Sequence, residues 1–556
     1  MGALSSVDSF ESADQVLRQN LLPNIQVEDA LVSDALASQY SPDAVVESLP
    51  PVDRFPLYGA QPSTDPQTVY IEIWSSSEKS NALKESERWL VDVAEAFNGQ
   101  QVRISSGQVI QVGVRRVPSG LAAQMIAANA AQPNGFTPAN GLWMAWLESE
   151  GVTPEITTDR LVPNQAGFVV DEATYQALSA GGEPDFETVL DAVLSGNLAI
   201  GYPNPYVSTT ALNLLYTICW HAAGHNETGQ PLTVANLQSP DVSSVFDTFQ
   251  NQVVITTPTA PDLMQLFIRD PDKLQAFPLE YQDYVNLRKL PGFERTAYIP
   301  FGVPHYSPLA GFEWNTPAQR EALQKLTDFA ISEPMQQLAA TKGFELTAYL
   351  QGANLPPMPS GEVLKAAQAF WKQRKDGGRS VYMMIVIDTS GSMEGDRLQA
   401  VQAGPRVAIR QINTGNQVGL MTVSDAPARL VNIAPSDTLQ QQRLLAAIDS
   451  LRADGGTAMY DAMMVALADL LDQQKADPDG RFYMLLLTDG AANEGLTFSE
   501  VQEILRYSDV RVYPIAYGEV DQQELQAIAT LRESTVQEGT PENIEELLKG
   551  LFQTSL

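Results

Sequence analysis

The chain has 556 residues, 44% of them hydrophobic, which suits about three domains with ordinary buried cores. Its 34 basic and 67 acidic residues give a net charge of −33. This balance argues against nucleic-acid binding, which needs lysine and arginine to neutralise phosphates, and against docking on an anionic membrane surface. The single cysteine, Cys219, lies in an apolar stretch and excludes an internal disulfide.

The chain shows neither a membrane-spanning run nor a secretion signal. It has no window of about 18 apolar residues, and its amino terminus lacks a basic segment followed by an apolar one. Taken literally, this predicts a soluble chain. An ectodomain from which a leader or a membrane tether has been removed fits the same sequence equally well.

Residues 1–66 are predicted to form an acidic N-terminal arm or tether. The segment carries ten acidic residues, only Arg18 and Arg54 as bases, and no lysine. Prolines in its second half favour extended backbone. Two arrangements remain open: a flexible tether that holds the body away from a membrane anchor, or an arm docked on its own or a neighbouring subunit.

Residues 67–355 show a less regular alternation of strands and helices. Strands are predicted at 69–74, 109–114, 253–256 and 298–301, and helices at 85–97, 121–130 and 317–331. Between them lie recognisable turns and loops at 75–79, 118–120, 138–146, 198–205 and 208–210. This order resembles the type 2 periplasmic binding fold, the bilobed solute receptor of bacterial transport systems.

The resemblance implies two α/β lobes that close about a hinge when a small polar solute enters the cleft between them. Lobe 1 would contain residues 67–165 and 296–350, and lobe 2 residues 166–295. The cleft would be lined by strand-to-helix turns, whose free amides and hydroxyls suit an anion or a polar solute. The weak ligand-binding candidates there are Ser75, Ser76, Ser119, Ser208, Thr209 and Glu280. For each serine or threonine, an ordinary helix cap is the competing interpretation.

Residues 356–378 are predicted to be a linker that separates this domain from the rest of the chain. Prolines stiffen its start, a short helix spans about residues 363–375, and Gly377 and Gly378 end it.

The segment after residues 381–387 carries the most specific chemistry in the chain. Those seven residues are almost all apolar or β-branched, which predicts a strand buried on both faces of a parallel sheet. Asp388, Ser390 and Ser392 follow at its carboxyl end, where open α/β sheets bind ligands. One carboxylate and two hydroxyls at alternate positions can converge on a hard cation.

Two later loops offer further oxygen ligands. Thr457 stands at the entrance of a helix whose apolar positions run from 459 to 470, and Asp489 follows a second buried strand at 483–487. This order of five residues resembles the von Willebrand factor type A domain with its metal-ion-dependent adhesion site. The resemblance covers residues 379–556. Further elements at 417–423, 439–451, 510–517 and 541–552 fit the doubly wound, Rossmann-like sheet that it implies.

The adhesion-site resemblance also implies roles for the five residues. Asp388, Ser390, Ser392 and Thr457 would lie in or near the first shell of Mg²⁺, Ca²⁺ or Mn²⁺, and Asp489 would act through water. A protein partner would offer an aspartate or glutamate to the open coordination position.

Enzyme signatures are missing from the sequence, and no catalytic residue is predicted. There is no Gly-x-Ser-x-Gly elbow and no Walker-type phosphate loop. His221 and His225 are four residues apart, but Gly224 interrupts them and no glutamate follows His221 as a zinc protease requires. The chain is therefore predicted to be non-enzymatic.

Three functions remain open for the α/β chain as a whole. The first is a binding protein that engages a protein partner through the cation, with a solute-receptor domain beside it. The second is a solute receptor of a transport system, with the metal domain as a coupling or anchoring module. The third is a self-assembling envelope protein whose acidic arm reaches a neighbour's metal site. The combined resemblances imply an extracytoplasmic location: periplasmic, membrane-anchored or at the cell surface.

Overall fold

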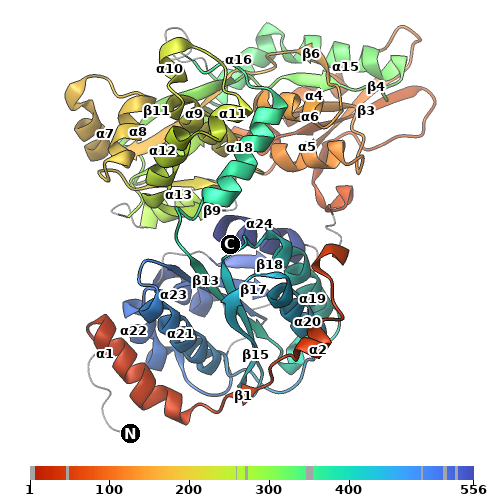
Figure 1. Ribbon diagram of the computed structural model, residues 1–556. Helices are drawn as coiled ribbons and strands as arrows, with labels where there is room; N and C mark the ends of the chain where they lie inside the picture. Colours follow the sequence, from red (N-terminus) through yellow and green to blue (C-terminus); the bar gives the residue numbers. More distant parts are fainter. Residues whose placement is uncertain are drawn as a thin grey trace. The chain divides into compact units, whose positions relative to one another are not determined.

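The computed structural model divides the chain into two compact units (Figure 1). It describes residues 7–45, 49–257, 260–269, 273–345, 355–489, 492–517, 522–531, 536–541 and 543–556. The inserted unit is Leu49–Gly377, and the split unit joins Met1–Ser48 to Gly378–Leu556. In the described part of the chain, no helix is both long enough and apolar enough to cross a membrane.

The inserted unit contains two sheets, each the centre of one α/β lobe. The first lobe has a six-stranded sheet in the order β2 (Leu57–Gly59), β4 (Val109–Arg116), β3 (Thr68–Ser75), β5 (Gly135–Thr137), β12 (Leu309–Gly311) and β6 (Glu155–Thr158). The second lobe has a five-stranded sheet in the order β11 (Thr296–His305), β7 (Asn164–Asp171), β10 (Ala276–Glu280), β8 (Ile200–Pro203) and β9 (Val253–Thr257).

Helices cover both sheets. Those of the first lobe are α3 (Ser77–Ser80), α4 (Trp89–Gly99), α5 (Ser119–Ala127), α6 (Leu142–Ser149), α15 (Pro317–Ala330) and α16 (Glu333–Thr341). Those of the second lobe are α7 (Glu172–Leu178), α8 (Phe186–Leu194), α9 (Thr209–Ala222), α10 (His225–Thr228), α11 (Val234–Leu237), α12 (Pro240–Asn251), α13 (Ala260–Arg269) and α14 (Tyr281–Leu287). The predicted bilobed α/β architecture is therefore present.

The chain crosses between the lobes twice, at residues 159–163 and 306–308. The two crossings are hydrogen bonded, since the amide of Leu161 donates to the carbonyl of Tyr306 over 3.1 Å. The prediction that residues 296–305 belong to lobe 1 was wrong, because β11 pairs antiparallel with β7 in the five-stranded sheet. The crossing comes after β11, at Ser307, whose φ of 46° breaks the extended run.

The inserted unit begins earlier than the sequence predicted. Leu57–Gly59 were placed in the arm, but β2 pairs antiparallel with the edge of β4. Arg115 holds the approach to β2 by donating to the carbonyls of Val52 over 3.0 Å and Phe55 over 2.7 Å. Prolines around β2 interrupt the strand pattern, so this short edge strand was not predicted from the sequence.

The predicted linker is also part of the inserted unit. Its helix, α18 (Gly361–Arg374), buries Val363, Leu364, Ala367, Phe370 and Trp371 in the main apolar cluster of that unit. It is thus a packed helix and not a spacer.

The split unit is a doubly wound sheet with β13 (Val381–Asp388) at its centre. The seven strands run in the order β1 (Glu28–Asp29), β15 (Pro427–Pro435), β14 (Gln417–Val423), β13, β16 (Arg481–Thr488), β17 (Arg511–Tyr517) and β18 (Gln537–Gly539). Helices α19 (Asp396–Ala408), α20 (Thr438–Ser450), α21 (Met459–Ala476), α22 (Phe498–Tyr507), α23 (Gln522–Leu531) and α24 (Ile544–Ser555) flank it.

Alternation along β13 explains why helices are needed on both faces. All eight of its residues are buried. Val381, Met383, Ile385 and Ile387 join one apolar cluster, whereas Tyr382, Met384 and Val386 join the other. Successive side chains of a strand point to opposite faces, so an all-apolar strand must be covered on both.

The described part of the N-terminal arm packs on its own split unit. Helix α1 (Phe10–Val16) and the following π-helical turn Leu17–Leu21 lie against α22 and α21 (Figure 1). Strand β1 adds in parallel to β15, and α2 (Asp34–Ala37) contacts α20. Of the two arrangements that the sequence left open, the described residues show the docked one.

Candidate metal centre and solute cleft

The candidate metal centre starts where β13 ends. Asp388 is fully buried, and its Oδ1 accepts a hydrogen bond from the amide of Ser390 over 2.8 Å. Its Oδ2 accepts from the hydroxyl of Thr488, at the end of the adjacent β16, over 2.7 Å. Burial raises the pKa of the Asp388 carboxyl, although these hydrogen bonds oppose the shift.

Three more of the predicted residues form a chain of oxygens beside Asp388. Ser390 Oγ lies 3.0 Å from Ser392 Oγ, and Ser392 Oγ donates to Asp489 Oδ1 over 2.8 Å. Parallel pairing of β13 with β16 explains this meeting, because it brings both carboxyl ends to one edge of the sheet.

The loop that carries Thr457 reaches the same edge. The amide of Gly391 donates to the carbonyl of Gly455 over 3.0 Å, and the amide of Asp454 donates to that of Thr389 over 2.9 Å. Thr457 itself is buried, and its amide donates to Asn493 Oδ1 over 2.8 Å. Backbone contacts therefore hold the fifth predicted residue in a loop beside the other four.

The donor set fits a hard divalent cation. In an octahedral magnesium site, with Mg–O distances of about 2.1 Å, adjacent ligand oxygens are about 3 Å apart. The 3.0 Å between Ser390 Oγ and Ser392 Oγ matches such an edge, and the 2.8 Å hydrogen bond from Ser392 Oγ to Asp489 Oδ1 keeps the Asp489 carboxylate beside the two serines. Among the described residues, no group of three or more His, Cys, Asp or Glu forms an alternative metal site.

One residue at this centre was missed by sequence reasoning. Arg397, in the first turn of α19, donates through Nη1 to Asp489 Oδ2 over 2.7 Å and to the carbonyl of Ser392 over 3.3 Å. Its sequence signal, a basic residue in the first turn of the helix that follows the serines, is not distinctive. Its charge offsets that of Asp489 and leaves Asp489 Oδ1 directed at Ser392.

The solute-cleft candidates lie at strand ends and helix starts between the two lobes. In the first lobe, Ser76 Oγ donates to Glu78 Oε1 over 2.5 Å and accepts from the ammonium of Lys79. Ser75 is buried beside it. Ser119 Oγ accepts a long bond of 3.4 Å from the amide of Ala139.

In the second lobe, two candidates have structural roles. Ser208 caps α9, because its hydroxyl accepts from the amide of Ala211 over 3.3 Å. Thr209 Oγ1 accepts from Trp143 Nε1 over 2.9 Å, a bond that joins the lobes directly. For Ser208 the helix-cap interpretation is therefore the observed one.

Glu280 belongs to a buried polar chain. Its two carboxylate oxygens lie 2.7 and 2.9 Å from His305 Nδ1, and His305 Nε2 lies 2.9 Å from Asn213 Nδ2. These contacts suit a neutral histidine that donates from Nδ1 and accepts at Nε2. Burial raises the pKa of Glu280 and lowers that of Lys79.

Sequence reasoning missed four buried polar atoms in the same region. In the described part of the chain they have no hydrogen-bond partner, and the residues are at most 1% exposed. They are Thr137 Oγ1 and Asn140 Nδ2 in the first lobe, and Asn164 Nδ2 and Gln282 Oε1 in the second. Each such atom costs about 1–3 kcal/mol unless something satisfies it.

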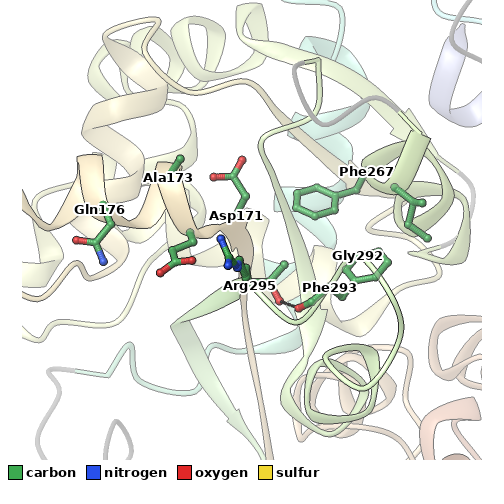
Figure 2. A pocket seen from close by; sticks show the side chains of 10 residues that line it. Asp171, Ala173, Gln176, Phe267, Gly292, Phe293 and Arg295 are labelled. Atoms are coloured by element: carbon green, nitrogen blue, oxygen red, sulfur yellow. Dashed lines mark hydrogen bonds between the residues drawn. The ribbon is translucent and has the colours of Figure 1, made fainter.

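A surface pocket of about 640 Å³ lies elsewhere, on the second lobe (Figure 2). Its walls come from three segments of the second lobe: residues 171–173 and 176, residues 267–268, and residues 292–293 and 295–296. None of the six cleft candidates lines it. Asp171 already caps α7 by accepting from the amide of Thr174 over 2.7 Å.

Comparisons with known proteins match both parts of the chain. Residues 383–549 match the family model of the von Willebrand factor type A domain, and residues 84–345 match that of the bacterial extracellular solute-binding protein. Inter-alpha-trypsin inhibitor heavy chain H4 from Sus scrofa is 30% identical over 129 residues. That match covers 22% of this chain and 14% of the relative.

Solved structures resemble each part separately. A von Willebrand factor type A protein from Catenulispora acidiphila is 22% identical, with coverage of 32% of this chain and 42% of that chain and a TM-score of 0.30. The sulfate-binding protein SubI from Mycobacterium tuberculosis is 16% identical, with coverage of 52% and 93% and a TM-score of 0.35. Iron-bound HitA from Pseudomonas aeruginosa is 14% identical, with coverage of 56% and 99% and a TM-score of 0.39.

The two family matches fall on the two units that the structure separates, the first within the C-terminal part of the split unit and the second within the inserted unit. The chain therefore joins a bilobed domain of the bacterial extracellular solute-binding family to a von Willebrand factor type A domain.

Proposed function

We propose that this chain is a non-enzymatic, extracytoplasmic binding protein that engages a protein partner through a divalent cation. The observation that carries the proposal is the chain of oxygens from Ser390 through Ser392 to Asp489, next to the buried carboxylate of Asp388. Both families that the chain matches are families of binding domains. In this proposal, the solute-binding domain also binds a small polar ligand.

Each residue of the metal centre has a role in this proposal. Asp388, Ser390, Ser392 and Thr457 hold Mg²⁺, Ca²⁺ or Mn²⁺, and Asp489 orients the site through water. Bound there, the cation attracts an acidic side chain of the partner. Ser392 and Gly391 are exposed, so that side of the centre is open to solvent.

Retention on a carboxylate surface tests this function. A protein of net charge −33 is repelled by a matrix bearing immobilised glutamate unless a cation bridges the two. We expect the chain to be retained in Mg²⁺ or Mn²⁺ and released by EDTA. Equal elution with and without the metal would contradict the proposal.

Metal-dependent self-association is a separate outcome of the same experiment, measured by sedimentation. It would support the structural alternative, in which the acidic arm reaches a neighbour's metal. The described arm favours the first function, because Asp14 pairs with Lys475 over 3.0 Å and Asp34 pairs with Arg443 over 2.7 Å within its own chain.

A second candidate function, solute receptor of a transport system, has its own supporting observation. Thr137 and Asn140 of the first lobe, and Asn164 and Gln282 of the second, have buried polar atoms without a hydrogen-bond partner among the described residues. A polar solute between the lobes would satisfy them. Because Glu78 and Glu280 add carboxylates there against the ammonium of Lys79, the region favours a solute with a positive charge over an oxyanion.

Calorimetry with defined probes tests this second function. We expect arginine or putrescine to bind and sulfate or molybdate not to bind. Asn164→Ala should weaken that binding about tenfold, by the roughly 1–3 kcal/mol of a lost buried hydrogen bond, whereas the exposed control Asn197→Ala should not. Preference for sulfate, or no binding of any probe, would count against this receptor.

A further inference from the structure

Helix α18 lies against both lobes of the solute-binding domain (Figure 1). Its first half contacts α6 of the first lobe, where Lys365 pairs with Glu150. Gly361 packs so closely that an added Cβ would meet the carbonyl oxygen of Ala145 at 2.0 Å. Only glycine fits there without moving the helix.

The second half of α18 contacts the second lobe. Trp371 Nε1 donates to the hydroxyl of Tyr202 over 2.7 Å, and Arg374 pairs with Asp247 of α12 over 2.6 Å. The rings of Phe370 and Phe246 meet edge to face, with centroids 5.0 Å apart. One helix thus makes polar and apolar contacts with both lobes.

A single side chain joins the two sets of contacts. Gln368 Oε1 accepts from Trp146 Nε1 of the first lobe over 3.2 Å, and Gln368 Nε2 donates to the carbonyl of Pro205 in the second lobe over 3.0 Å. Gln368 is only 3% exposed. When the lobes separate, Gln368 loses one of these two partners.

The lobes also touch directly beneath this helix. Trp143 of the first lobe bonds to Thr209 of the second, and Gln124 Nε2 donates to the carbonyl of Tyr206 over 3.2 Å. The apolar cluster that contains α18 also includes buried residues of both lobes. In this structure, therefore, the lobes touch each other and α18 packs against both of them.

The end of α18 is fixed on the second lobe. Gly377, with a φ of 63°, lies against Asn251 of α12, and an added Cβ would meet Asn251 Oδ1 at 2.5 Å.

We propose that α18 is a clamp that holds the two lobes of the solute-binding domain together. In the clamped arrangement Gln368 bonds to both lobes, and when the lobes part it keeps a partner in only one of them.

Distances between spin labels on the two lobes test the clamp. Cys219 is fully buried, and burial raises the pKa of its thiol to about 12, so introduced cysteines can be labelled selectively. Ile331→Cys marks the first lobe and Leu290→Cys the second, since these side chains are 43% and 49% exposed. Pulsed electron paramagnetic resonance then gives the distance distribution in the full chain.

The variant to compare is Gln368→Met, which keeps the side-chain length and removes both hydrogen bonds. We expect it to broaden and lengthen the interlobe distances, while Gln373→Met, an exposed position on the same helix, leaves them as in the parent. Trp371→Phe, which removes the bond to Tyr202, should act in the same direction as Gln368→Met. Parent-like distances in both Gln368→Met and Trp371→Phe overturn the clamp.

Discussion

Asp388→Asn is expected to abolish binding of Mg²⁺, Ca²⁺ and Mn²⁺ to metal-stripped protein, as measured by calorimetry. Loss of an outer partner of a metal site already costs roughly 10–100-fold in affinity, and Asp388 is proposed to be a direct ligand. The substitution removes the negative charge and leaves the size of the side chain unchanged. The parent should show saturable binding at one site.

The local structure should survive this substitution. The introduced amide side chain still offers an oxygen to the backbone amide of Ser390, and the Thr488 hydroxyl can turn to accept from its NH₂ group. The matched control is Asp479→Asn, an exposed turn residue of the same unit that should bind metal like the parent. Metal binding that is retained in Asp388→Asn, or lost in Asp479→Asn, would contradict the assigned ligand set.

Leu17→Ala is expected to lower the free energy of unfolding of the split unit by about 2–5 kcal/mol, the usual cost of truncating a buried leucine. Leu17 is fully buried in the apolar cluster shared with α21 and α22. In the sequence, the inserted unit separates the arm from the rest of the split unit. The effect is expected because Leu17 nevertheless packs in the core of the split unit. The matched control, Leu31→Ala, removes a leucine that is 45% exposed in the same arm.

Tryptophan fluorescence separates the two units in this measurement. All seven tryptophans lie between Leu49 and Gly377, so their signal reports the inserted unit alone. Calorimetric unfolding should show a lower transition temperature for the split unit in Leu17→Ala, with the tryptophan transition unchanged. Equal stability of Leu17→Ala and Leu31→Ala would mean that the arm adds no stability to this unit.

The metal-centre loops were predictable because each candidate directly follows a buried strand or enters a helix. The apolar run of β13 indicated a central parallel strand, and parallel pairing brings the ends of β13 and β16 to one edge. Arg397 was not predicted, since its contact with Asp489 depends on where α19 begins after the loop. A basic residue in a first helical turn has no distinctive sequence signal.

For the candidate cleft residues, the sequence predicted positions at strand ends and helix starts but not the contacts that they make. Ser208 was named as a candidate and proves to be a helix cap, an alternative that the sequence had left open. Asn164 and Gln282 were not named, because nothing in their local pattern distinguishes a buried amide with one unpartnered atom from an exposed amide. Whether a polar atom finds a partner depends on residues brought together from distant parts of the chain.

From the sequence alone, the order of strands, helices and loop residues resembled two domain families, and the second resemblance supplied the five candidate metal-site residues. Only the tertiary structure decided that the arm docks and that the predicted linker is a packed helix. Arg18 meets Asp472 across 454 positions of sequence, and Gln368 meets Trp146 across 222. Local patterns report the backbone periods of single elements, whereas such distant partners are selected by packing and by satisfaction of buried polar groups.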